Sequence, residues 1–153
     1  MNLIELDDKA LQDLSKDQIR AFIQNITEKA LSGAGDTVPI EVPIHHHFSK
    51  DVYAREMRVP KGAVIVGKIH KFQNLNILSQ GEVSVISIDG VMRVKAPYTF
   101  VASPGAQRVF YMHEDTVWTV VHGTDETDVE KIEEKFIAKS YEELGEEVKC
   151  LGS

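Results

Sequence analysis

The sequence predicts a mainly β protein in which one β domain is flanked by two helices. Between Gly33 and about Gly123, short runs rich in Val, Ile, Thr, Tyr and Phe alternate with Gly, Pro and Asp-Gly turns. The turns recur about every 8–17 residues, a spacing typical of a sandwich or small barrel of about eight strands rather than of βαβ units. Amphipathic segments on either side of this region predict the two helices.

The N-terminal helix is predicted over residues 17–32. Four apolar residues recur there at helical spacing and form one stripe: Ile19, Phe22, Ile23 and Ile26. Ser15 is the expected N-cap of this helix, and Gly33 is the expected stop. With the residues around it, the helix forms a predicted N-terminal extension of residues 1–37.

The β domain is predicted to span residues 38–124, and within it Ala63 to His70 is expected to form one strand. Successive side chains on a strand alternate between its two faces. One face is expected to carry Val64, Val66, Lys68 and His70, and the other Ala63, Ile65, Gly67 and Ile69. Both faces are largely apolar, yet they include a Lys and a His two residues apart. This pattern suits a barrel whose lumen holds polar groups among hydrophobic walls.

The C-terminal segment, residues 125–153, is predicted to contain a helix from Val129 to about Ala138. Its apolar positions are Val129, Ile132, Phe136 and Ile137. Acidic residues concentrate in its first turn, where they suit the positive end of the helix dipole. Both helices are expected to cover edges of the β domain or another subunit.

Composition narrows the class of protein. The 153 residues include 17 Lys and Arg against 24 Asp and Glu, a net charge of −7, so the chain lacks the basic character of a general nucleic-acid binder. No apolar run approaches the ~18 residues that span a bilayer, and the N-terminus lacks the basic and apolar regions of a secretory signal. The single Cys150 cannot form an internal disulfide. These features predict a cytoplasmic protein with no nucleic-acid or membrane partner.

Two stretches of the sequence match a known pair of motifs. The first motif is Gly, five residues, His-x-His, three or four residues, Glu, six residues and Gly; the second ends in Pro-x-Gly-x-x-His-x-x-x-Asn. The places of the first motif are taken by Gly62, Lys68, His70, Asn74 and Gly81. Anchoring the second motif on Gly105 puts Ser103, Arg108 and Met112 at its Pro, His and Asn. Over roughly residues 40–123, the chain therefore resembles the cupin (RmlC-like jelly-roll) superfamily.

This resemblance implies a fold: a cupin-like double-stranded β-helix (jelly-roll) barrel with flanking N- and C-terminal α-helices. Residues 53–56, 67–71 and 113–118 also look like small cupin-like proteins encoded by tailed phages, and no activity is carried over from that group. The resemblance, together with the need to protect edge strands, also implies a homodimer.

Cupins hold a divalent metal with three His and one Glu, and this chain departs from that set. Lys68, Asn74 and Arg108 stand at three of the four ligand positions, and only His70 remains. Arg has no lone pair for a metal, and a Lys would first have to lose its proton. No metal and no other cofactor is therefore expected. Lys68 and Arg108, joined by His70 when it is protonated, instead supply positive charge in a concave lumen.

The leading prediction is thus a metal-independent cupin-like protein that binds an anionic small molecule of the phosphate, nucleotide or sugar-acid type. The predicted ligand-binding residues are Lys68, His70, Asn76, Arg108, Phe110 and Met112. Phe110 and Met112 are included because they share a strand face with Arg108 and would form an apolar wall beside it.

Two alternatives remain open. One is a lyase, isomerase or epimerase in which His70 is the general base, Tyr111, Tyr53 or Lys68 is the acid, and Arg108 stabilises an anion. Glu56 would neutralise Lys68 or serve as a base if it faces the lumen, although an ion pair between strands is the simpler interpretation. The other alternative is a phage accessory interaction protein that uses the barrel as a scaffold.

Four further features have simpler structural interpretations. In the run His45-His46-His47, the first and third side chains point one way and the second the other, so at most two could join His70 around a metal, and a solvent-facing run is the favoured interpretation. Arg55 is expected at the surface or at a dimer interface. Trp118 is expected to pack against the C-terminal helix or a partner subunit. The turn of residues 113–115 is expected to be hydrated, with Asp115 capping its own backbone.

Overall fold

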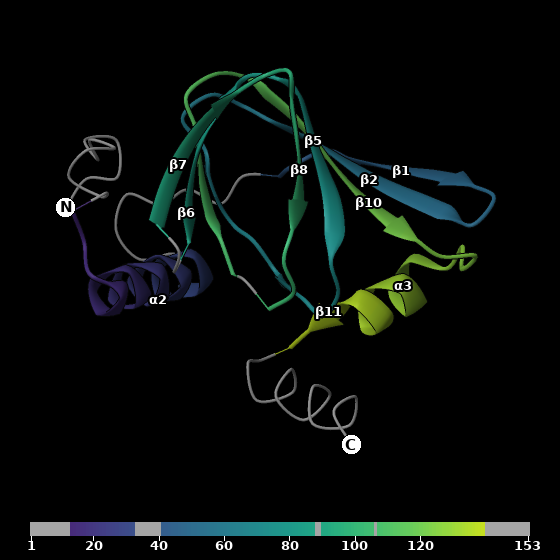
Figure 1. Ribbon diagram of the computed structural model, residues 1–153, viewed down its shortest axis with the longest axis horizontal. Coiled ribbons are helices and arrows are strands. Elements are labelled where there is room, and N and C mark those ends of the chain that lie inside the picture. Colours follow the sequence, from purple (N-terminus) through teal and green to yellow (C-terminus); the bar gives the residue numbers. More distant parts are fainter. Residues whose placement is uncertain (1–12, 33–40, 88–89, 106, 140–153) are drawn as a thin grey trace.

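The computed structural model describes residues 13–32, 41–87, 90–105 and 107–139 (Figure 1). In these residues, ten strands lie between Ile44 and Gly123, and one short strand follows the second helix. The helices are α2 (Lys16–Ser32) and α3 (Val129–Phe136). The strands are β1 (Ile44–Ser49), β2 (Val52–Val59), β3 (Val64–Val66), β4 (Ile69–His70), β5 (Asn74–Gln80), β6 (Glu82–Ser87), β7 (Gly90–Lys95), β8 (Tyr98–Ala102), β9 (Val109–Met112), β10 (Thr116–Gly123) and β11 (Ile137–Ala138). No helix in the described ranges is both long enough and apolar enough to cross a membrane.

The strands form three antiparallel sheets. A five-stranded sheet has the order β1-β2-β10-β5-β8, a four-stranded sheet has the order β3-β9-β6-β7, and β11 pairs with β4. The main core lies between the two larger sheets and consists of Val59, Leu78, Val83, Val85, Val94, Met112, Trp118 and Val120. Across the described residues, the sheets do not join into one closed barrel. The structure therefore has the predicted mainly β fold with two helices, without the closed double-stranded β-helix.

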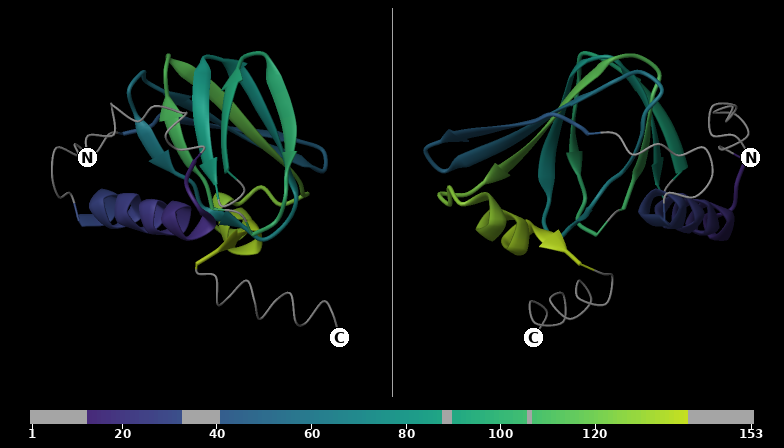
Figure 2. Two further views of the ribbon diagram at one scale, coloured as in Figure 1. Left: turned by 60° about the vertical axis from the view of Figure 1, so that its left-hand side comes forward. Right: turned by 180° about the vertical axis from the view of Figure 1, so that it is seen from behind.

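Helix α2 forms where the sequence predicts it. Ser15 caps its first turn, because the Gln18 backbone N donates to Ser15 Oγ at 3.3 Å and the Ser15 backbone N donates to Gln18 Oε1 at 2.8 Å. The predicted apolar stripe packs on the outer face of the four-stranded sheet, against Ile86 and Val109. Both helices lie at the end of the molecule where the two large sheets diverge (Figure 2). The predicted stop, Gly33, lies outside the described residues.

The single strand predicted from Ala63 to His70 is wrong. The chain forms β3, leaves the four-stranded sheet at Gly67, and continues as β4 beside β11. Val64 and Val66 pack with the α2 cluster, whereas Ile65 packs against the core between the sheets. The break therefore takes Lys68 and His70 out of the strand in which strict alternation had grouped them with Val64 and Val66.

Helix α3 begins at the predicted residue and ends two residues earlier than predicted. Asp128 Oδ1 accepts a hydrogen bond from the Glu130 backbone N at 3.0 Å, which caps the first turn. Ile137 and Ala138 leave the helix because they pair with His70 and Ile69 of β4. This pairing attaches the C-terminal end of α3 to the strand that carries His70.

The structure corrects the sequence interpretations of Trp118 and Asp115. Trp118 is 1% exposed and lies between the large sheets, with Phe100 and Phe110 edge-on to its ring, so its predicted packing on the C-terminal helix is wrong. Asp115 Oδ1 accepts from the backbone N of distant Lys61 at 2.9 Å, so it ties its turn to another turn.

Candidate functional site

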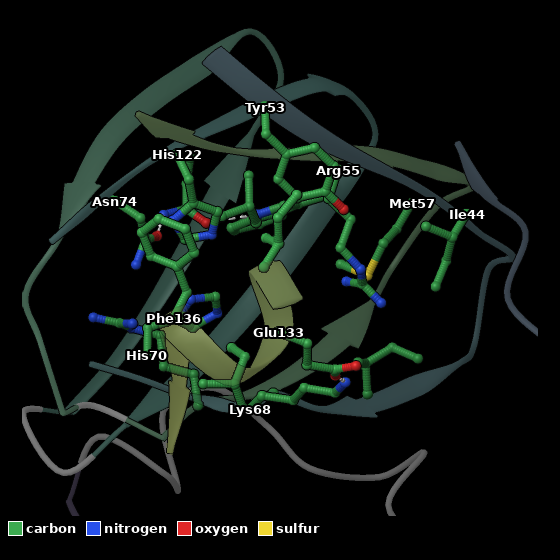
Figure 3. A pocket seen from close by; sticks show the side chains of 18 of the residues that line it. Ile44, Tyr53, Arg55, Met57, Lys68, His70, Asn74, His122, Glu133 and Phe136 are labelled. Atoms are coloured by element: carbon green, nitrogen blue, oxygen red, sulfur yellow. Dashed lines mark hydrogen bonds and ion pairs between the residues drawn. The ribbon is translucent and has the colours of Figure 1, made fainter. Parts of the chain in front are cut away.

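A cavity of about 350 Å³ lies between the inner faces of the strands and helix α3 (Figure 3). Residues of β1, β2, β3, β4, β5, β9, β10, α3 and β11 line it, so all three sheets and the C-terminal helix contribute walls. Its volume falls at the lower end of the ~300–1,000 Å³ typical of small-molecule sites.

Three cationic side chains line this cavity. Arg55 extends from β2, Lys68 lies in the link between β3 and β4, and Arg108 immediately precedes β9. The only acidic residue among the described lining residues is Glu133 of α3, which forms an ion pair with Lys68. Figure 3 shows Arg55 reaching into the cavity toward this pair. The charged lining groups therefore sum to an excess of positive charge.

Strand alternation explains why Arg55 points inward. On β2, Tyr53, Arg55 and Met57 face the cavity, whereas Glu56 and Arg58 lie on the opposite face. Burial lowers the pKa of Arg55, but an arginine stays protonated at any physiological pH. Burial is also the main cause that lowers the pKa of Lys68, and the charge of Arg55 lowers it further.

Gly67 allows the Lys68 segment to lie close to Arg108. The Gly67 backbone N donates to the Arg108 carbonyl O at 2.7 Å. A Cβ at position 67 would lie 3.0 Å from Phe110 Cε2 and 3.1 Å from the Arg108 carbonyl O, which leaves little space for a side chain. The absence of a side chain at this residue thus permits the approach that brings Lys68 and Arg108 to one cavity.

Two histidines lie side by side in the cavity wall. The ring centroids of His70 and His122 are 5.4 Å apart, and His122 also stacks on Phe136 at 4.4 Å. The pKa of each ring is lowered to about 4, and burial is the largest cause. Nearby cations lower both pKa values further, and His122 also lowers the pKa of His70. Both rings are therefore neutral at pH 7. The Nδ1 atom of each is buried without a hydrogen-bond partner, and a molecule bound in the cavity could supply one.

A chain of hydrogen bonds fixes the amide side chains in the wall. Trp118 Nε1 donates to Asn76 Oδ1 at 2.9 Å, Asn76 Nδ2 donates to Asn74 Oδ1 at 2.7 Å, and Asn74 Nδ2 donates to the Phe72 carbonyl O at 3.2 Å. Each of these polar groups has at least one protein partner, so the chain is stable inside the protein.

The structure brings most of the predicted ligand-binding residues together. Five of the six line the cavity: Lys68, His70, Asn76, Arg108 and Phe110. Met112 does not, because the strand carries it past the cavity into the core, where it is 1% exposed. Of the predicted catalytic residues other than His70, Tyr111 lies outside the cavity beside His113, at 4.8 Å between ring centroids.

Glu56 and Arg55 lie on opposite faces of β2, and Arg55 is the one that faces the cavity. Glu56 lies on the outer face of β2, where Arg58 Nε donates to its Oε2 at 2.9 Å and His47 Nε2 lies 3.5 Å from its Oε1. It therefore does not neutralise Lys68, whose partner is Glu133. The prediction that Arg55 lies at the surface or an interface is wrong. Alternation places the two residues on opposite faces, but the sequence alone did not indicate which face turns inward.

The histidine run on β1 divides between the two faces as predicted. His46 lines the cavity, and its Nδ1 lies 2.7 Å from the Tyr53 hydroxyl, whereas His47 faces Glu56 on the outside. His45 and His47 therefore do not face His70. All three histidines are exposed, as the favoured interpretation predicts.

The residues in the cavity do not fit the metal that the cupin resemblance implies. Asn74, at the position of the family glutamate, already accepts a hydrogen bond through Oδ1, and Lys68 is ion-paired. Arg108, at the position of a family histidine, has no lone pair for a metal. Within the described ranges, no three His, Cys, Asp or Glu side chains come together in a way that could hold a metal ion.

Comparisons with known proteins give structural matches only. No family model and no curated protein match the sequence. An RmlC-like cupin from Shewanella frigidimarina NCIMB 400 is 14% identical with a TM-score of 0.48, over 60% of this chain and 83% of that one. KdgF from Halomonas sp. is 17% identical with a TM-score of 0.48, over 63% and 93% of the two chains. An acetylacetone dioxygenase from Acinetobacter johnsonii is 15% identical with a TM-score of 0.46, over 59% and 74%. The solved structures similar to this chain thus include an RmlC-like cupin and a dioxygenase.

Proposed function

We propose that this chain is a metal-independent, cupin-like protein that binds a small anionic molecule in the cavity beside α3. The observation that carries the proposal is the convergence of Arg55, Lys68 and Arg108 on one cavity, with Glu133 as the only acid among the described lining residues. The chain as a whole has a net charge of −7, so the positive cavity runs against its overall charge.

The chemistry of these groups suits an anion. A guanidinium group can donate two parallel hydrogen bonds to a carboxylate or phosphate, and partial burial strengthens such bonds by excluding water. The neutral imidazoles of His70 and His122 add no charge at pH 7. The sign of the potential is therefore set by Arg55, Lys68 and Arg108 against the carboxylate of Glu133. Phosphate, nucleotide and sugar-acid ligands all carry the required charge.

The enzyme alternative is less well supported. A general base works best when its pKa lies near the working pH, and a pKa of about 4 makes His70 a weak base at neutral pH. Burial raises the pKa of Tyr53, which makes it a weaker acid. The scaffold alternative does not account for a cavity of about 350 Å³ lined by charged residues.

Isothermal titration calorimetry with Arg55→Gln and Arg58→Gln tests the proposal. Both residues are arginines of β2, but only Arg55 faces the cavity, so Arg58→Gln is a matched control. The titrants are inorganic phosphate, AMP, gluconate and 3-phenylpropionate. We expect at least one anion to bind, with affinity reduced about tenfold or more by Arg55→Gln and unchanged by Arg58→Gln. Thermal melts establish that both variants fold. Failure of all four anions to bind in an Arg55-dependent manner would contradict the proposal.

A further inference from the structure

We infer that the ligand is a small hydrophobic carboxylate, namely a compact ring or branched hydrocarbon that carries one carboxylate group. This inference rests on the proposed function and narrows it. Three features of the cavity support it. The walls are largely apolar, most of the neutral polar groups in them are hydrogen-bonded to one another, and the cavity is small and positively charged.

Apolar side chains from both large sheets and from α3 form the walls around the cations. Met57, Ile65, Phe110 and Val120 project from β2, β3, β9 and β10, and Phe136 adds a ring from α3. These side chains present mainly carbon atoms, and the sulfur of Met57 is only a weak hydrogen-bond acceptor. Burying a hydrocarbon against these side chains lowers the free energy, because its apolar surface is removed from water. Burying a hydroxyl there raises the free energy, because its hydrogen bonds to water are lost and not replaced.

The polar groups of the walls are largely engaged with one another. The hydrogen bonds from Trp118 to Asn76 and from Asn76 to Asn74 use the groups that would otherwise contact a ligand. The Tyr53 hydroxyl is already within 2.7 Å of His46 Nδ1. The Nδ1 atoms of the two cavity histidines are the exceptions, because they have no partner among the described residues. Two ring nitrogens are fewer partners than the row of hydroxyl groups on a polyhydroxylated ligand requires.

Charge and volume point to an anionic group on a compact body. Lys68 is already paired with Glu133. Arg55 of the five-stranded sheet carries a guanidinium group, which can make a two-pronged contact with one carboxylate. A cavity of about 350 Å³ has room for one ring and a short linker beside these groups. The same space is small for a base, a ribose and a phosphate together.

The test compares three probes by isothermal titration calorimetry at pH 7 and low salt. The first probe, 3-phenylpropionate, has one carboxylate and an apolar body. Gluconate has one carboxylate and a polyhydroxylated body, and AMP represents nucleotides. We expect 3-phenylpropionate to bind at least about tenfold more tightly than either of the others.

Matched variants locate the binding. Val120 faces the cavity and its neighbour Val121 lies on the other face of β10. Val120→Thr keeps the shape of the side chain and replaces one methyl group with a hydroxyl. It should therefore weaken the binding of 3-phenylpropionate several-fold, whereas Val121→Thr should not. Arg55→Gln should lower the affinity for 3-phenylpropionate about tenfold, and Arg58→Gln should leave this affinity unchanged.

The possible failures are distinguishable. Gluconate or AMP binding as tightly as 3-phenylpropionate in an Arg55-dependent manner would overturn the hydrophobic-carboxylate inference and leave the proposed function intact. Binding of 3-phenylpropionate that is insensitive to both Arg55→Gln and Val120→Thr would also overturn it, because the ligand would then lie elsewhere. If no probe, inorganic phosphate included, binds through Arg55, the proposed function itself is wrong.

Discussion

Two buried imidazoles show how position changes the chemistry of a residue. His70 and His122 each have a pKa of about 4 in the folded protein, against 6.5 in an exposed setting, and burial is the largest cause. The neutral His122 ring stacks on Phe136 and on His70, whereas the protonated form of either histidine would place charge in a poorly solvated wall beside the cavity cations. Protonation and folding are therefore coupled at this pair.

Stability should fall as the pH is lowered from about 6.5 towards 4, because the unfolded chain binds more protons at these two sites than the folded one in that window. Above pH 6.5 this contribution to stability is complete. His122→Gln should flatten the pH dependence of the free energy of unfolding between pH 7 and 5, where most carboxylates do not yet titrate. Urea denaturation at several pH values measures this free energy, and the exposed His45→Gln is the control. NMR titration of both rings near pH 6.5 would contradict the expectation.

Individual residues also show what sequence reasoning can reach. The alternation on β2 follows from spacing. The grouping of Lys68, His70 and Arg108 was implied by the cupin resemblance, and all three line the cavity. The inward face of β2 could not be predicted, because it depends on which side of the five-stranded sheet faces the cavity. That sheet includes β10, β5 and β8, which are distant from β2 in the sequence. The contribution of Glu133 was missed for a similar reason: an acidic helix face looks solvated until a distant lysine is placed beside it.

At the scale of elements, the cap and the apolar stripe of α2 were more predictable than the ends of β3 and α3. Ser15 and the stripe on α2 follow from local chemistry. The break at Gly67 and the early end of α3 arise from long-range pairing, with the Arg108 carbonyl in one case and β4 in the other. Periodicity reports the local preference and carries no signal for such distant partners.

The turn glycines provide a prediction at this scale. Gly81 has φ +99°, and an added Cβ would lie 2.5 Å from Thr116 Oγ1 and 2.8 Å from the Asp115 carbonyl O. Gly62 has φ +83° and nothing within 4 Å of the same position. Gly62→Ala should cost about 1 kcal/mol, from backbone strain alone. Gly81→Ala should cost about 3 kcal/mol or more, because backbone atoms must also move. Urea denaturation compares them, and equal losses would refute the steric argument.

At the scale of the whole molecule, two large sheets share one core at their inner faces, and they diverge toward the end that holds the helices (Figure 1). The core fills the space where the sheets are close. Farther along, the side chains no longer meet, and α3 with its β11 extension borders the remaining space. The cavity is thus a product of the same divergence that leaves the sheets unjoined.

A pair of leucines on β5 should separate core from surface. Leu78 is 0% exposed between the sheets, whereas Leu75 is 37% exposed on the outer face of the same strand. Leu78→Ala should lower the free energy of unfolding by about 3 kcal/mol, through lost burial and a residual void. Leu75→Ala should lower it by less than about 1 kcal/mol. Chemical denaturation measures both, and similar losses would place the core elsewhere.

The sole tryptophan of the sequence gives the cavity a built-in optical reporter. Its indole is nearly sealed from solvent, hydrogen-bonded to Asn76, and part of the cavity lining. Emission from the unlabelled protein should therefore be blue, and any guest that settles against the indole should alter its intensity or wavelength. Occupancy can be followed in real time without a dye, a tag or an engineered fluorophore.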